Sequence, residues 1–264
     1  MLNMMKITLK GIFRDRVFQG IMVLAVLFLF IPSAASLSMR QVTELSVTLS
    51  LSLISFILLL LSVFLGATSL WRDIERRYTF GVLSLPLSRC SYILGRFFGL
   101  ALFLMLVSAL LGGAAFLAIK AASTLYPADR PLVWSWFTLA VIYATLKYVL
   151  LVAVALLLST VSTSFFLPVF GTICTFLASG ISQQVYEYVH SAAAAETVSP
   201  FFRQAVTVAY YLIPNLAGFD LTVNAIYSVA PNPGGLALTA CYFLAYTAIL
   251  LGVSIFLFNR REMK

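Results

Sequence analysis

Apolar residues form long, nearly continuous runs along this chain, and short polar stretches separate them. A helix needs about 20 such residues to cross the hydrocarbon core of a bilayer. The runs do not alternate between apolar and polar positions, as the strands of an outer-membrane barrel do. They therefore predict an all-α integral membrane fold with six transmembrane helices, at residues 19–37, 45–71, 97–119, 133–158, 165–181 and 236–258.

Two further segments are mixed rather than fully apolar. Before the first span, Lys6, Lys10, Arg14 and Arg16 are interspersed with apolar residues, which predicts an interfacial helix at the membrane surface. Residues 182–235 combine prolines with aromatic residues and are apolar enough to enter the outer leaflet. We expect this outer segment to form a re-entrant or interfacial helical element, or a loop packed over the ends of the spans.

Composition excludes several classes of protein. Of the 264 residues, 62% are apolar and 10% are charged, whereas soluble domains are about half apolar and a quarter charged. This balance excludes an ordinary soluble enzyme and a disordered chain. Cys90, Cys174 and Cys241 are an odd number of cysteines without CxxC spacing, so they predict neither a disulfide framework nor a cysteine metal site.

Lysine and arginine gather on one side of the predicted spans. Four precede the first span, five lie in residues 72–96 and three follow the last span, which makes twelve of the seventeen. Because basic residues are enriched in cytoplasmic loops, both termini and residues 72–96 are predicted to face the cytoplasm. The net charge of +8 then reflects topology and contact with anionic lipid rather than nucleic-acid binding.

The sequence offers little catalytic chemistry. It contains one histidine, His190, and none of the motifs HExxH, GxSxG or the phosphate-binding GxxxxGK(S/T). We therefore predict no enzymatic activity, no cofactor and no metal site. Any active transport would draw its energy from a partner chain or from ions.

One ionisable residue, Lys147, lies inside a predicted span. Charged side chains at that depth are costly and often mark a translocation path, so Lys147 is the candidate path residue. Its aliphatic stem could instead carry the ammonium toward the surface if the span is displaced by a turn. No acidic residue lies inside a predicted span to pair with it, which argues against a proton-coupled or sodium-coupled carrier.

The connection between the second and third spans, residues 72–96, has a pattern of its own. Asp73 precedes Arg76 and Arg77 by three and four residues, a spacing that supports a helix continuing out of the second span. Pro86 then disfavours further helix, so we expect a short helix that crosses the membrane face.

Four aliphatic residues, Val82, Leu83, Leu85 and Leu87, give this short helix an apolar surface. Ser88 follows them and can cap the helix that runs into the third span. An exposed apolar edge rimmed with charge is a docking surface for another protein. By composition alone, the segment is also compatible with an ordinary basic cytoplasmic loop.

The order of these features resembles the cytoplasmic loop of type-2 ABC transporter permeases. Members of that family often show an acidic-basic cluster, a Leu pair, Pro-x-Ser-Arg, and Gly-Lys or Gly-Arg at the start of the third span. The outer stretch 210–220 and the ending Phe-Asn-Arg-Arg are similar to family segments too. The matching loop residues are Asp73, Glu75, Arg76, Arg77, Thr79, Val82, Leu83, Pro86, Ser88, Arg89, Gly95 and Arg96.

The resemblance implies that residues 1–264 form a single permease domain of an ATP-driven ABC exporter. It further implies a partner ATP-binding cassette subunit, a homodimer or paired permease, and a place in the bacterial cytoplasmic membrane. The residues expected to dock the ATPase are Asp73, Glu75, Arg76, Arg77, Val82, Leu83, Pro86 and Arg89.

Two alternatives stay open at this point. A non-transporting membrane anchor or assembly factor would share every compositional feature of the chain. A membrane-embedded enzyme would need clustered histidine, glutamate or aspartate at membrane depth, which the sequence lacks.

Overall fold

The computed structural model describes residues 2–28, 42–75, 88–125, 132–191 and 198–260. This part of the chain is helical and contains no β-strand. It includes five helices that are long and apolar enough to cross a membrane, and a bent helix pair that could supply a sixth crossing. The chain is therefore an all-α integral membrane protein, as its apolar runs predicted.

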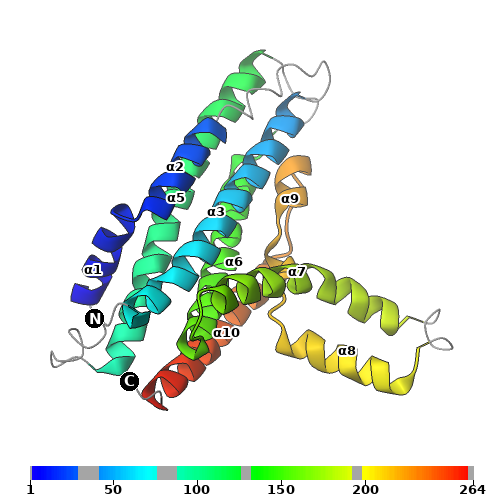
Figure 1. Cartoon of the computed structure of the whole chain (residues 1–264). Coiled ribbons are helices and arrows are strands. Elements are labelled where there is room, and N and C mark those ends of the chain that lie inside the picture. The colour runs from blue at the N-terminus through cyan, green and yellow to red at the C-terminus, as the bar shows by residue number, and fades with distance from the viewer. Residues whose placement is uncertain (1, 29–41, 76–87, 126–131, 192–197, 261–264) are drawn as a thin grey trace.

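The described helices follow one another with short breaks (Figure 1). In chain order they are α1 (Leu2–Phe13), α2 (Arg16–Phe28), α3 (Val42–Glu75), α5 (Arg89–Leu125), α6 (Trp134–Val161), α7 (Phe166–Val189), α8 (Pro200–Leu212), the 3₁₀ turn η3 (Ala217–Phe219), α9 (Thr222–Tyr227) and α10 (Pro233–Arg260). Figure 1 places α1, the end of α3, the start of α5 and the end of α10 at one end of the bundle.

The predicted spans overlap these helices, and three of them differ in extent. The third, predicted at 97–119, lies within the longer α5, which begins at Arg89 and ends at Leu125. The described part of the first span is α2, and residues 29–37 lie outside the described residues. The fifth span ends later than predicted, because α7 continues to Val189. Its last turns are polar but remain helical, and Gln183 Nε2 donates to Glu187 Oε1 one turn later at 3.0 Å.

Helix α6 lies at the centre of the bundle, between α3, α5 and α10. Residues 148–156 are all buried, so this helix has no face left for solvent or lipid over two turns. A helix that is apolar all round is expected in such a central place. The other helices arrange themselves around it.

Helices α3 and α6 approach closely because a glycine lies between them. A Cβ added to Gly66 would lie 2.8 Å from the Cβ of Ala155. In lipid, where burial of apolar surface gives no driving force between helices, small residues allow this packing. The close approach also lets the Ser159 hydroxyl donate to the Ala67 carbonyl at 3.0 Å.

The predicted interfacial helix at the N-terminus is α1, and it packs along α5. Its buried face consists of Met4, Thr8 and Ile12, spaced four residues apart, while Lys6 on the other face is exposed. A Cβ on Gly99 of α5 would lie 2.8 Å from the Thr8 Cβ. The basic side of α1 is therefore free while its apolar side is held against the bundle.

Helices α7 and α8 form an arm that leaves the bundle sideways (Figure 1). The rings of Tyr186 and Tyr210 stack between them at 4.3 Å. The predicted outer segment thus contains the end of α7, all of α8, and the bent connection through η3 to α9. Its helical character is confirmed, and α8 and the η3–α9 pair meet at a bend of 45°.

We expect Gly66→Leu to lower the thermal unfolding midpoint of the purified protein, because the new side chain must separate α3 from α6. Overpacking of this kind costs about 1–3 kcal/mol. The matched control is Gly113→Leu, since a Cβ at Gly113 of α5 meets nothing within 4 Å. Equal midpoints for the two variants would contradict the close α3–α6 contact.

Candidate functional site

The candidate site lies where α3 ends and α5 begins, at the end of the bundle shared by α1 and the end of α10 (Figure 1). Of the residues predicted to dock a partner, Asp73 and Arg89 have described side chains, and Glu75 is the last residue of α3. The others lie outside the described residues: Arg76, Arg77, Val82, Leu83 and Pro86.

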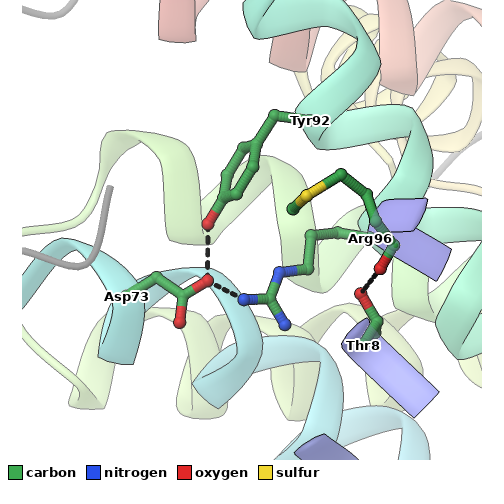
Figure 2. A network of polar contacts seen from close by, with 5 residues as sticks. Thr8, Asp73, Tyr92 and Arg96 are labelled. Carbon is green, nitrogen blue, oxygen red and sulfur yellow. Dashed lines mark hydrogen bonds and ion pairs between the residues drawn. The ribbon is translucent and has the colours of Figure 1, made fainter. Parts of the chain in front are cut away.

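Asp73 joins α3 to α5 through a shared carboxylate oxygen (Figure 2). The Tyr92 hydroxyl donates to its Oδ2 at 2.5 Å, and the Arg96 guanidinium forms an ion pair with the same oxygen. The Arg96 and Asp73 side chains are only 14% and 16% exposed. Hydrogen bonds between charged groups removed from water are strong, so this network fixes the two helix ends against each other.

The sequence spacing offered Asp73 partners on its own helix, at Arg76 and Arg77. Those two residues lie outside the described residues, and in the structure the Asp73 carboxylate contacts Tyr92 and Arg96 on the neighbouring helix. No periodicity along one helix signals such a contact, because the partners are about 20 residues away in sequence. In the sequence, Arg96 matches the family pattern, but it does not belong to the residues predicted to dock the ATPase.

Arg89 lies against the end of α10, more than 160 residues later in the chain. Its Nη1 donates to the carbonyl of Asn259 at 2.9 Å and to that of Phe258 at 3.3 Å. A cation is favoured there, because the last carbonyls of a helix lack partners and carry partial negative charge. The Tyr92 and Phe258 rings stack at 5.8 Å beside this contact.

The predicted cap at the start of α5 is confirmed. The Ser88 side chain accepts a hydrogen bond from the Ser91 N–H at 3.2 Å, which satisfies a free donor of the first turn. Four side chains, those of Asp73, Arg89, Tyr92 and Arg96, join the ends of α3, α5 and α10, and we call this set of contacts the frame.

A cavity of about 160 Å³ adjoins the frame between α1, α3 and α5. Asp73 and Arg96 border it on one side, and Thr8 and Asp15 border it on the other. The Thr8 hydroxyl is already bonded to the Met4 carbonyl at 2.8 Å (Figure 2). Helix α1 therefore shares this cavity with Asp73 and Arg96 of the frame.

Lys147, the candidate path residue, lies near the middle of α6. Its ammonium lies 5.6 Å from the centre of the Tyr148 ring and 5.3 Å from that of Phe176 on α7. The sequence offered no acidic partner inside a span. From the outer segment, Asp220 interacts electrostatically with Lys147.

The connection that carries Asp220, residues 213–221, is held by side chains of two helices, and we call it the elbow. Ser179 of α7 donates to the Pro214 carbonyl and accepts from the Leu216 N–H, the latter at 2.8 Å. On α10, Tyr242 accepts from the Asn215 N–H at 2.9 Å. These contacts hold the backbone of this proline-containing connection against α7 and α10.

Tyr246 of α10 also supports the elbow, because its hydroxyl donates a hydrogen bond to the Leu212 carbonyl at 2.7 Å.

Within the described ranges, no three histidine, cysteine, aspartate or glutamate side chains come together as a metal site. The chemistry of the site is therefore that of charge pairs and helix junctions.

One protein family matches this chain over nearly its whole length. The model of the ABC-2 family transporter proteins matches residues 2–263. A search of curated proteins gives no match. The chain belongs to the ABC-2 transporter family. It is thus a multi-pass membrane permease of an ABC transporter, and family membership implies a partner with an ATP-binding cassette.

The frame predicts a measurable coupling between Asp73 and Arg96. Asp73→Leu and Arg96→Met should each lower stability, because each leaves an unpaired charge in a partly buried site. The double variant should lose less than the sum of the two, by about 0.5–3 kcal/mol. Thermal unfolding of the four purified proteins in one detergent measures this, and additive losses would contradict the pairing.

Proposed function

We propose that this protein is the permease subunit of an ATP-driven exporter and that it docks a separate ATP-binding subunit through residues 72–96. In this proposal both termini face the cytoplasm of a bacterial cell, and the permease works as a homodimer or with a related permease. The chain lacks a phosphate-binding motif, so ATP hydrolysis belongs to the partner.

The frame is the observation that carries the proposal. Residues 72–96 include the end of α3 and the start of α5, where Asp73 and Arg96 join these two helices and Arg89 joins α5 to α10. A force applied to the connection would therefore act on three helices together. Rigid-body movement of packed helices is a recurrent way of passing a signal between sites.

The frame also divides the proposed docking residues into two groups. Asp73 and Arg89 have partners within the chain, so their role is to hold the base of the docking surface. The surface that contacts the ATPase is assigned to the other six: Glu75, Arg76, Arg77, Val82, Leu83 and Pro86.

Lys147 completes the proposal as a residue of the translocation path. Its ammonium lies among aromatic rings at the depth of the membrane interior, where a charge without use is costly. The distribution of lysine and arginine supports the orientation, since twelve of seventeen lie on the side of the termini.

Co-purification with the candidate ATPase subunit tests docking. Glu75→Ala combined with Arg76→Ala, and separately Leu83→Asp, should lower the amount of bound ATPase about tenfold, as loss of a central interface contact does. Lys120→Ala and Glu187→Ala are the controls, because both side chains are exposed and lie away from the frame. Their yield of ATPase should equal that of the unchanged protein.

Two outcomes would overturn the docking assignment. If the ATPase co-purifies equally with the loop variants, the partner binds elsewhere. If no ATPase binds the unchanged protein, the chain acts as a membrane anchor or assembly factor instead.

Orientation is tested by labelling single cysteines in a background without Cys90, Cys174 and Cys241. In intact cells, Asn232→Cys, between α9 and α10, should react with a membrane-impermeant maleimide. Lys10→Cys on α1 should react only after the cells are opened. Both positions are exposed, and the reverse pattern would place the termini outside.

A further inference from the structure

Lys147 lies too far along α6 for its ammonium to reach either end of the helix. Helix α6 has 28 residues with Lys147 near its midpoint, so its Cα is about 20 Å from either end. A lysine side chain is far shorter than that distance. The charge must therefore be stabilised by groups inside the bundle.

The described surroundings stabilise this charge only in part. The Tyr148 and Phe176 rings, which stack at 6.3 Å, present their electrons to the ammonium at 5.6 and 5.3 Å. An ammonium also carries three hydrogen-bond donors. Within the described part of the chain, its Nζ makes no hydrogen bond or direct ion pair. The rings therefore support the cation, and donors of the ammonium are left for a further acceptor.

Asp220 is the charged group that interacts electrostatically with Lys147, and its carboxylate is engaged elsewhere. Its Oδ1 accepts from the Thr222 N–H at 3.0 Å at the start of α9, and the side chain is exposed. The neighbouring Phe219 is buried and anchors the elbow. Asp220 therefore lowers the electrostatic cost of Lys147 from a distance and does not saturate its donors.

The elbow is not tightly packed on all sides. A cavity of about 330 Å³ adjoins it, lined on the elbow by Asn215, Gly218 and Phe219 and on α10 by Leu238 and Tyr242. This space lies beside the segment that carries Asp220.

We infer that Lys147 binds the anionic head of an amphipathic ligand, a carboxylate or phosphate group on an apolar body, in competition with the internal carboxylate of Asp220. The apolar body would lie among the rings and aliphatic side chains that surround α6. As a statement about cargo, this inference rests on the proposed transport function. As a statement about binding, it needs no ATPase.

The competition has a definite direction. A ligand anion would form charge-assisted hydrogen bonds with the ammonium, which are strong away from water. Asp220 opposes it by repulsion between like charges. Removal of that charge should therefore tighten binding, whereas removal of the Lys147 charge should abolish it.

The test measures binding to the purified chain in neutral detergent by isothermal titration. The probes are laurate, dodecyl phosphate and the uncharged dodecanol, which share one alkyl chain length. Laurate and dodecyl phosphate should bind, and dodecanol should bind about tenfold more weakly. Lys147→Met should lower the affinity for both anions about tenfold, and Lys147→Arg should retain it.

Asp220→Asn is the decisive variant, because the amide oxygen can still accept from the Thr222 N–H while the charge is lost. It should bind laurate several-fold more tightly. Lys120→Met and Glu187→Gln are matched controls, since each removes one exposed charge outside the elbow, and neither should change the affinity.

Unchanged affinity in Lys147→Met, or equal or weaker binding in Asp220→Asn, would overturn the inference, provided that each variant keeps the unfolding midpoint of the parent. Nanodiscs with phosphatidylglycerol or phosphatidylcholine distinguish the source of the anion. Competition by phosphatidylglycerol identifies a membrane lipid, and its absence with laurate still bound identifies a free amphiphile. Failure of ATPase docking would leave all of these results unaffected.

Discussion

The carboxylate of Asp73 is the contact on which the end of the bundle depends. It accepts from the Tyr92 hydroxyl and pairs with the Arg96 guanidinium, so the end of α3 is held by two groups of α5. Because the pair is largely removed from water, loss of either partner leaves a costly unpaired charge. The junction is therefore a fixed point, and the connection between the two helices begins and ends on it.

Close packing extends this fixed point into the membrane. Lipid offers helices no hydrophobic reason to associate, so contact area and polar bonds between helices decide the arrangement. Gly66 and Gly99 let α6 and α1 approach their neighbours, and Ser159 bonds across one of these contacts. Arg89 adds α10 through the carbonyls that end that helix. The helices that meet at the proposed docking surface are thus linked to one another by direct contacts.

The protein uses charge in two different ways. The Asp73–Arg96 pair is tight and is joined by a phenol, which suits a structural junction. Lys147 and Asp220 interact at a greater separation, with aromatic rings supporting the cation and a backbone N–H holding the carboxylate. The first pair has its partners already, whereas the second leaves donors for a ligand. The elbow matters because it carries Asp220, which lies outside the predicted spans and interacts electrostatically with Lys147.

The sequence by itself determined the helical membrane class, the approximate spans and the cap at Ser88. Each of these depends on neighbours along the chain: the free energy of membrane insertion sums over one segment, and a cap involves residues within one turn. Only the tertiary structure decided that Asp73 pairs with Arg96, that Arg89 bonds the end of α10, and that Asp220 interacts electrostatically with Lys147. A polar group takes the partner that is nearest in space, and helix packing brings together residues that no spacing along the sequence relates.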